Sequence, residues 1–405
     1  MKYPREFLEK IPKTDLHVHL DGSLRLKTLI ELARQDGIEL PSYTEEGLRS
    51  LVFKDKYRDL PDYLQGFQYT TSVLQSGEAL ERVAYELAQD NLKEGVRYIE
   101  VRFAPQLHVN DRQDYEQVLS AVDRGLSRLR QEANASLDVR ERGLPQFNYG
   151  IIACAMRMFK PGFSEYYRRL FQVFPYSTDV QVYRQASLEL AKAVCAIRDK
   201  KNLPIVGFDL AGQEAGFPAY THKEAYEYCH RRFMKKTVHA GEAYGAASIF
   251  QSISDLHANR IGHGYYLFDE EKISEIEPQE RTRYIRDLAN YIADRRITME
   301  VCLTSNMQTN PSIKDIKNHT LKKMLENGLS VTVCTDNRLV SNTTVTDELQ
   351  LAVDNFDITP KRLKDIIIYG FKRNFYPATY MEKRVYCRQI IDYYQKLESE
   401  FKIVY

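Results

Sequence analysis

Two histidines one residue apart form the first part of a chemical pattern in this chain. His17 and His19 lie in the stretch T-D-L-H-V-H-L-D-G at residues 14–22. Alternate side chains of a β-strand project to the same face, so both imidazoles point in one direction. Two neutral imidazoles on one face make half of a divalent-metal site, and zinc is the usual metal in nitrogen-rich sites. The pair alone is weak evidence, because a core or surface role explains an isolated H-x-H equally well.

Three later segments supply the groups that such a site still needs. His239 and Glu242 stand in T-V-H-A-G-E, and His263 stands in R-I-G-H-G. Asp336 follows the run V-C-T. Each segment ends a short apolar or β-branched run, which is typical of a buried parallel strand that meets its loop. The set is typical of a catalytic zinc site, with three or four protein ligands, an open position for water, and acid and base groups nearby.

Eight strand-like runs are available to position these residues. They are residues 14–20, 96–103, 148–156, 204–210, 236–240, 259–262, 297–303 and 329–335. Segments of helical period, such as 79–94 and 186–200, separate them, and this alternation predicts an α/β fold closed as a (β/α)₈ TIM-type barrel. An open doubly wound sheet is the alternative. It is disfavoured because the candidate residues end strands 1, 5, 6 and 8, and those ends converge on one mouth only in a barrel.

Composition limits the class of protein and its partners. Hydrophobic residues make up 43% and charged residues 28% of the 405 residues, the balance of a soluble globular protein. No linker rich in Pro, Gly or Ser divides the chain, so we expect one domain over residues 1–405. The net charge of +1 provides no general attraction for nucleic acid or an anionic membrane. The expected partner is therefore a small molecule, with no nucleic acid and no membrane.

Targeting and cysteine patterns favour a cytoplasmic protein. Residues 1–13 lack an apolar segment typical of a secretory signal, and no run of about 18 apolar residues suggests a membrane span. The six cysteines show no C-x-x-C spacing, which favours reduced thiols and argues against a disulfide framework or a structural zinc site.

Other polar and aromatic residues receive structural interpretations. Glu100 and Arg102 lie two apart on the second predicted strand, and we expect them to pair with each other inside the barrel. The aromatic side chains of residues 161–185 are expected to pack within the chain, although a pocket rim or a partner chain are alternatives. We expect surface positions for the remaining histidines, His108, His222, His230, His257 and His319.

Six motifs taken together resemble those of the adenosine deaminase family of metal-dependent hydrolases. They cover most of the chain in the family's order, and the linked set is far more specific than any one motif. The resemblance implies a (β/α)₈ barrel with one zinc ion per chain. It also implies hydrolysis of the 6-amino group of adenosine or 2′-deoxyadenosine to inosine or 2′-deoxyinosine and ammonia, a purine salvage reaction. The motifs are H-V-H-L-D-G-S (17–23), D-L-A-G-Q-E (209–214), H-A-G-E (239–242), R-I-G-H-G (260–264), S-N (305–306) and T-D (335–336).

The resemblance also assigns metal and catalytic roles to residues of this chain. Glu242 matches the residue that acts on the purine N1, and His263 matches the residue that orients and deprotonates the attacking water. Attack at C6 places electron density on N1, so Glu242 has to carry a proton, and a water-poor pocket raises the pKa of a carboxylic acid. The positions that match the metal ligands are His17, His19, His239 and Asp336.

Substrate contacts follow from the same resemblance. Asp21 matches a contact to the ribose 5′-hydroxyl, and Gly212 matches a backbone contact on the purine N3 side. Phe67 resembles part of a helical lid inserted after strand 1, over the nucleoside. His19 is expected to border the substrate as well as to bind the metal.

The chain departs from the family pattern at one position. Most members have Asp-Asp after the last strand, whereas this chain has Asp336 followed by Asn337. An Asn amide N–H can still donate to N7, which is an acceptor, so binding need not fail. A second branch of the superfamily binds two metals through a carboxylated lysine after strand 4, and residues 207–212 contain no lysine, which favours one metal.

Two other functions stay open from the sequence. One is the same chemistry on free adenine or on a modified adenosine; AMP is disfavoured because no obvious Lys/Arg set accompanies the site. The other is a catalytically silent relative that only binds. The intact set of metal and catalytic residues argues against the silent relative.

Overall fold

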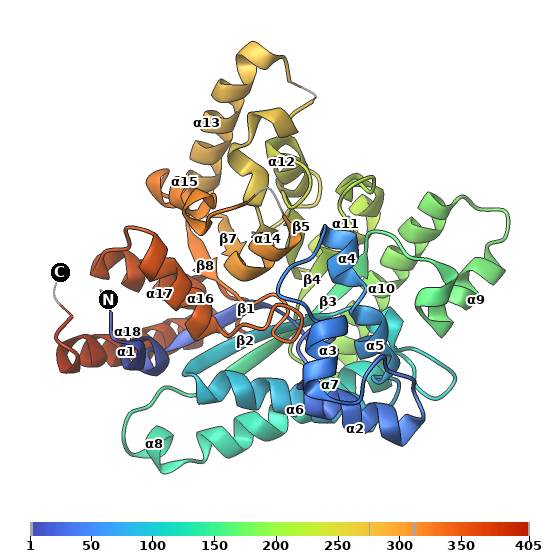
Figure 1. Ribbon diagram of the computed structural model, residues 1–405, viewed down its shortest axis with the longest axis horizontal. Helices are drawn as coiled ribbons and strands as arrows, with labels where there is room; N and C mark the ends of the chain where they lie inside the picture. Colours follow the sequence, from blue (N-terminus) through green and yellow to red (C-terminus); the bar gives the residue numbers. More distant parts are fainter. Residues whose placement is uncertain (1–2, 275, 311–312, 404–405) are drawn as a thin grey trace.

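The computed structural model describes residues 3–274, 276–310 and 313–403 and forms a barrel of eight parallel strands in the order β1 to β8 (Figure 1). The predicted (β/α)₈ barrel is confirmed, and each predicted strand overlaps an observed one. The strands are β1 (Lys13–His19), β2 (Val96–Phe103), β3 (Asn148–Met156), β4 (Ile205–Ala211), β5 (Lys235–Ala240), β6 (Arg260–His263), β7 (Thr298–Val301) and β8 (Val331–Val333).

The first strand and the segment after the last strand close the barrel. Val18 forms a parallel bridge with Asp336. The backbone N–H of His19 donates to the Asp336 carbonyl at 2.8 Å, and the Asp336 N–H donates to the His17 carbonyl at 2.8 Å. This closure therefore brings two of the candidate histidines next to the candidate carboxylate, although more than 300 residues separate them in the chain.

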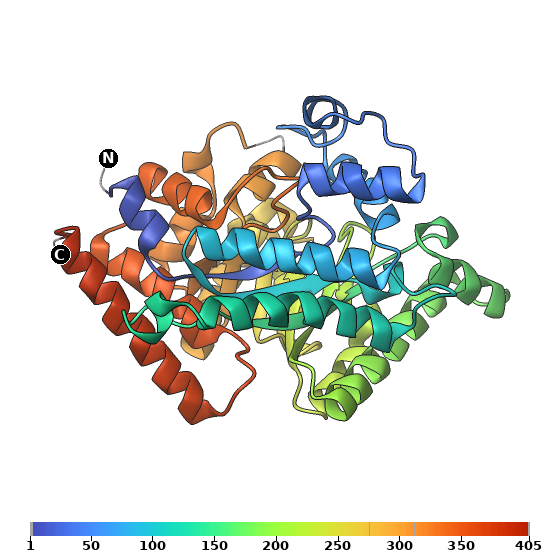
Figure 2. The same cartoon turned by 90° about the horizontal axis from the view of Figure 1, so that it is seen from below.

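Helices return the chain between successive strands (Figures 1 and 2). Within the described residues, none of these helices combines the length and apolar character that a membrane crossing requires. The longer ones are α2 (Leu26–Asp36), α6 (Gly77–Lys93), α7 (Tyr115–Asn134), α9 (Glu165–Val173), α10 (Asp179–Lys201), α11 (Lys223–His230), α12 (Ala246–Ser254), α13 (Pro278–Arg295), α16 (Val345–Asn355), α17 (Pro360–Arg373) and α18 (Tyr380–Glu400). The shorter ones are α1 (Arg5–Lys10), α3 (Glu45–Leu51), α4 (Leu60–Leu64), α5 (Phe67–Ser72), α8 (Leu137–Arg140), α14 (Leu303–Thr309) and α15 (Leu321–Glu326).

A helical insertion separates β1 from β2, as the resemblance implied. It comprises α2 to α5, and it contacts the segment that follows β8. The Tyr63 hydroxyl lies 2.8 Å from Ser341 Oγ, and Arg49 Nη1 donates to the Leu339 carbonyl at 2.8 Å. The insertion is thereby fastened to the loop beside Asp336.

Buried ion pairs fill the barrel interior and correct one prediction. Glu100 and Arg102 are both fully buried, but they do not pair with each other. Glu100 pairs with Arg260, whereas Arg102 donates to Asp209 at 3.1 Å and to Glu300 at 2.9 Å. Neighbouring side chains on one strand project inward side by side, so their partners come from other strands around the barrel.

Three of the histidines that we expected on the surface are buried. His108, His222 and His319 are each at most 2% exposed, whereas His230 and His257 are exposed as predicted. Burial lowers the pKa of His108 to about 4 and that of His222 to about 3, so both rings are neutral. Local polarity of the sequence was misleading because each buried ring has a hydrogen-bond partner of its own, for example the Leu74 carbonyl at 3.0 Å for His108.

The aromatic segment 161–185 packs mainly within the chain, as expected. Tyr167 stacks on Phe159 with ring centroids 3.8 Å apart, and Tyr183 meets Phe159 edge to face at 4.8 Å. Phe163 and Tyr176 are the exceptions, because Phe163 is exposed and the side chain of Tyr176 is fully exposed.

Candidate functional site

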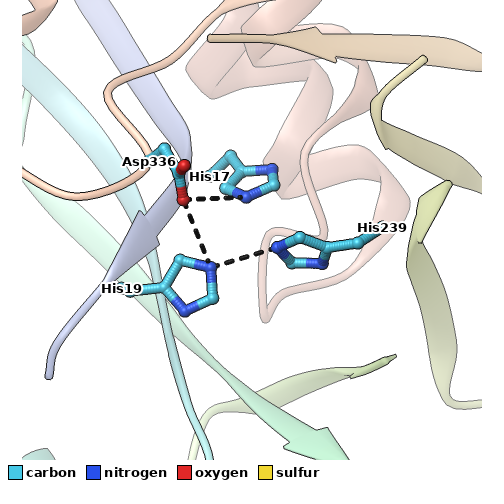
Figure 3. A group of neighbouring side chains, drawn as sticks. All are labelled: His17, His19, His239 and Asp336. Atoms are coloured by element: carbon cyan, nitrogen blue, oxygen red, sulfur yellow. Dashed lines mark hydrogen bonds and ion pairs between the residues drawn. The ribbon is translucent and has the colours of Figure 1, made fainter. Parts of the chain in front are cut away.

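Four buried side chains converge at the carboxyl ends of the strands (Figure 3). His17 and His19 come from β1, His239 comes from β5, and Asp336 follows β8. One ligand atom from each lies within 4.8 Å of the others. We call these four residues the ligand cluster.

The spacing of the ligand cluster suits one metal ion. His19 Nε2 lies 3.1 Å from His239 Nε2, and Asp336 Oδ1 lies 3.5 Å from the Nε2 atoms of both His17 and His19. A tetrahedral zinc ion with bonds of roughly 2.0–2.2 Å needs ligand atoms about 3.3 Å apart. In addition, His17 Nε2 is buried and has no hydrogen-bond partner. Three nitrogens and one carboxylate oxygen are a donor set that zinc accepts.

Carboxylates behind the ligand cluster set the direction of two rings. His17 Nδ1 lies 2.9 Å from Glu300 Oε2, and His239 Nδ1 lies 3.0 Å from Asp209 Oδ2. An ionised carboxylate only accepts, so each ring carries its proton on Nδ1 and turns the lone pair of Nε2 inward. Sequence reasoning missed these roles, although an inward-facing acid on a strand near a candidate histidine is a usable signal.

The Asp336 carboxylate is held in the same way. Ser305 Oγ donates to Asp336 Oδ2 at 2.6 Å, which leaves Oδ1 for the centre of the cluster. Burial opposes the charge, yet the close imidazole rings of His17, His263 and His19 hold the pKa of Asp336 below its ordinary value. Ser305 stood in the S-N motif, but no role was assigned to it.

The charge balance of the interior favours a cation. Four carboxylates face only two guanidinium groups, and negative charge therefore exceeds positive charge when all four are ionised. A buried excess charge is costly unless a counter-ion compensates it. The carboxylates are Glu100, Asp209, Glu300 and Asp336, and the guanidiniums are Arg102 and Arg260.

Glu242 and His263 stand beside the ligand cluster. Glu242 Oε1 lies 3.8 Å from His263 Nε2, and the two side chains are 8% and 1% exposed. Burial, with the Asp336 and Glu214 carboxylates nearby, raises the pKa of Glu242 to about 8. Burial also lowers the pKa of His263 well below its ordinary value. At neutral pH the pair is therefore a carboxylic acid beside a neutral imidazole.

One buried carboxylate holds the loop that carries Glu242. Glu214 accepts hydrogen bonds from the backbone N–H groups of Gly241 at 3.1 Å and Glu242 at 2.9 Å. It also accepts from Ala243 N–H at 2.6 Å and from Ser248 Oγ at 2.7 Å. Four or more hydrogen bonds to one carboxylate fix the backbone of this turn. The sequence contained Glu214 in a motif, but its role depends on a contact across 28 residues.

Two residues of the site have a left-handed backbone. His263 and Asp336 both have φ of 63°. A residue other than glycine pays about 1–3 kcal/mol for this conformation, and such strain clusters at functional sites. At both positions the turn ends a strand and directs a side chain back over the barrel mouth.

Three of the residues predicted to contact substrate lie in segments that follow barrel strands. Asp21 is buried, its Oδ1 has no hydrogen-bond partner, and burial raises its pKa to about 7. Asn337 Nδ2 donates to the Tyr63 hydroxyl at 2.9 Å, and its buried Oδ1 is unpartnered. Gly212 directly follows β4 with φ of 95°. Phe67 lies on α5 of the insertion and packs, partly buried, against the hydrophobic core.

Comparison with known proteins identifies the family. The sequence profile described as adenosine deaminase matches residues 12–178 and 178–391, which include every strand of the barrel. The chain belongs to the adenosine deaminase family. It is 34% identical over 374 residues to the adenosine deaminase of Mycobacterium avium, covering 92% of both chains.

Two further relatives extend the comparison. The probable adenosine deaminase of Dictyostelium discoideum is 33% identical over 371 residues, but the chain spans only 41% of that protein. The crystal structure of an amidohydrolase from Burkhoderia ambifaria, with bound Zn, superposes with a TM-score of 0.74 at 18% identity. That similarity covers 98% of this chain and 94% of the other, and it shows a shared fold.

Proposed function

We propose that this protein is a zinc-dependent adenosine deaminase that converts adenosine and 2′-deoxyadenosine to inosine and 2′-deoxyinosine with release of ammonia. Family membership supports the reaction class. The observation that carries the proposal is the ligand cluster, with His17 Nε2 unpartnered, beside the buried carboxyl of Glu242, whose pKa burial raises to about 8.

The ligand cluster would hold one zinc ion per chain. When bound, the ion supplies the nucleophile, because it lowers the pKa of a water molecule from about 15.7 toward about 7. The donor set and its spacing support zinc, and a bound Zn is also named for the structurally similar amidohydrolase.

Glu242 would supply the proton for the purine, and His263 would orient the attacking water. Attack of water at C6 moves electron density to N1, and the protonated Glu242 donates to that nitrogen. His263 orients the attacking water, since its Nε2 lies 3.8 Å from Glu242 and its ring lies against His17 with centroids 4.9 Å apart.

Five residues would position the nucleoside. The unpartnered Oδ1 of Asp21 supports a hydrogen bond to the ribose 5′-hydroxyl. Asn337 uses one amide N–H on Tyr63 and has a second for N7 of the purine. The backbone of Gly212 would face the N3 side, Phe67 would cover the nucleoside as part of the insertion, and His19 would border the substrate.

A parallel assay with zinc-loaded protein tests the proposal. We expect inosine from adenosine and 2′-deoxyinosine from 2′-deoxyadenosine, with ammonia in equal amount and about one zinc per chain. Adenine, N6-modified adenosines and AMP serve as alternative substrates in the same experiment. Faster turnover of adenine or of a modified adenosine would replace the substrate assignment, and no turnover of any of them would favour a silent relative.

We also propose a cytoplasmic location. All six cysteines are free and buried, which agrees with a reducing compartment. Fractionation of cells that produce the untagged chain, followed by immunodetection, would test the location.

A further inference from the structure

Two buried side chains connect a backbone amide to His263. The N–H of Leu321 donates to His319 Nδ1 at 3.0 Å. His319 Nε2 lies 3.2 Å from Asn306 Oδ1, and Asn306 Nδ2 lies 3.1 Å from His263 Nδ1. His319, Asn306 and His263 are each at most 2% exposed, so water does not compete for these hydrogen bonds.

The backbone amide determines the direction of every hydrogen bond in this series. A backbone N–H can only donate, so His319 Nδ1 accepts and carries no proton. Burial lowers the pKa of His319 to about 3, and the neutral ring therefore has its one proton on Nε2. That proton is donated to Asn306, which must present its oxygen. Leu321 is the first residue of α15, so its N–H has no carbonyl partner within the helix and is available as the anchor.

The side-chain amide of Asn306 in turn determines whether His263 Nδ1 donates or accepts. With Oδ1 turned to His319, Nδ2 faces His263 Nδ1 and can only donate. The flipped amide would place Nδ2 against the N–H of His319, two donors face to face. His263 Nδ1 therefore accepts, and the proton of the neutral ring lies on Nε2, the atom that faces Glu242.

We propose that Asn306 and His319 are positioning residues that hold His263 in the tautomer with its proton on Nε2. A ring in this tautomer has no lone pair on Nε2. It therefore orients the attacking water by donating a hydrogen bond to the water oxygen, and the proton that the water loses on ionisation passes to solvent and not to that atom. This refines the base role that the family resemblance implied. The catalytic consequence rests on the proposed deaminase function, whereas the tautomer does not.

Two substitutions change which atoms donate and which accept in this series of hydrogen bonds, and both keep His263. In His319→Leu no donor faces Asn306, so the Asn306 amide can flip. Either tautomer of His263 then becomes possible. In Asn306→Asp an ionised carboxylate faces Nδ1 and only accepts, which requires the proton on Nδ1. His319→Gln is the conservative control, since its side-chain amide N–H can donate to Asn306 as the histidine does.

Nitrogen-15 NMR of the zinc-loaded protein, labelled with 15N-histidine, reads the tautomer directly. His263 is assigned from the signals that are lost in His263→Gln. We expect an unprotonated Nδ1 and a protonated Nε2 in the parent and in His319→Gln, and the reverse in Asn306→Asp. A parent ring protonated on Nδ1, or an unchanged tautomer in Asn306→Asp, would overturn the proposal.

Kinetics of the same variants test the catalytic consequence. Loss of such an outer hydrogen bond typically lowers activity roughly 10–100-fold. We expect this fall in kcat with little change in KM for His319→Leu at equal zinc content, and recovery in His319→Gln. Equal kcat in all variants would contradict the catalytic consequence. An inactive parent that still shows the expected ring signals would contradict the deaminase function alone.

Discussion

The barrel interior contains two polar regions that differ in how their charged and polar groups are paired. The first is an ion-pair layer, made of Glu100, Arg102, Asp209, Arg260 and Glu300, in which every side chain bonds to an opposite charge of the protein itself. The second is the ligand cluster, in which ring nitrogens and one carboxylate oxygen face each other across 3.1–3.5 Å.

This difference distinguishes side chains that stabilise the fold, in the ion-pair layer, from side chains that we expect to bind a metal ion, in the ligand cluster. Each charge of the ion-pair layer would be costly to bury alone, so removal of one partner should affect stability first. The ligand cluster contains no Lys or Arg, and His17 Nε2 has no hydrogen-bond partner within the described residues. The two regions meet where Glu300 and Asp209 bind the outer nitrogens of His17 and His239.

The largest expected effect comes from removal of a ligand. His239→Ala should lose both zinc and detectable deaminase activity, because the cluster then keeps too few donors for a catalytic site. Metal content by elemental analysis and inosine formation are measured together. His257→Ala, at an exposed histidine, is the control and should retain both. A His239→Ala protein that keeps full zinc occupancy would contradict the ligand assignment.

Glu242→Gln should keep the metal and lose turnover. The variant removes the proton donated to N1, and general acid catalysis contributes roughly 10²–10⁴-fold. Because the parent carboxyl is already protonated at pH 7, the free energy of unfolding should change little. Steady-state kinetics with adenosine and elemental analysis check the prediction, with Glu224→Gln on the exposed face of α11 as control. Turnover within about tenfold of the parent would exclude Glu242 as the acid.

For the ion-pair layer we expect a loss of stability, in contrast to the loss of turnover expected for Glu242→Gln. Arg260→Met leaves Glu100 and Glu300 without one of their cations, and breaking a buried pair costs about 3–5 kcal/mol of unfolding free energy. Chemical denaturation of the variant measures this loss. The matched control is Arg283→Met, which breaks the exposed pair with Asp287 and should cost less than about 1 kcal/mol. Equal losses in the two variants would remove the distinction between the regions.

The pH dependence of turnover should follow the ionisation of Glu242, which lies beside the ligand cluster. Burial raises the pKa of Glu242 to about 8, so the reactive protonated form is present below that pH and is lost above it. On the alkaline side we expect kcat to fall about tenfold per pH unit above about pH 8, as one proton leaves Glu242. Residual turnover in Glu242→Gln should not show this fall. A parent profile that decreases already near the ordinary value of 4.5 would contradict a protonated acid.

Asn337→Asp is the smallest expected change. If Asn337 donates to N7, 7-deaza analogues, which lack that acceptor, should bind the parent more weakly than the matching purine ribosides. The Asp variant needs a proton for the same bond, so its binding should weaken as pH rises while that of the parent stays flatter. Inhibition constants for both analogues across pH measure this. Equal binding of the two by the parent would show that Asn337 does not contact N7.

Local sequence patterns predict the secondary-structure elements and the types of chemical group in the site. Apolar runs of short, regular length predicted all the strands, because a strand of a closed barrel is buried on both faces and its pattern is local. The H-x-H spacing placed two imidazoles on one face for the same local reason. The likeness of the linked motifs then indicated the family.

The partner of each buried polar group, in contrast, depends on the three-dimensional fold. Glu100 meets Arg260 and not Arg102, and His319 lies in the interior beside Asn306, because strands and loops distant in sequence meet around the barrel. Barrel closure between Val18 and Asp336 brings the ligand cluster together. The direction of a hydrogen bond depends on these long-range contacts, and so does the tautomer of a histidine ring. A local pattern of residues cannot predict such contacts.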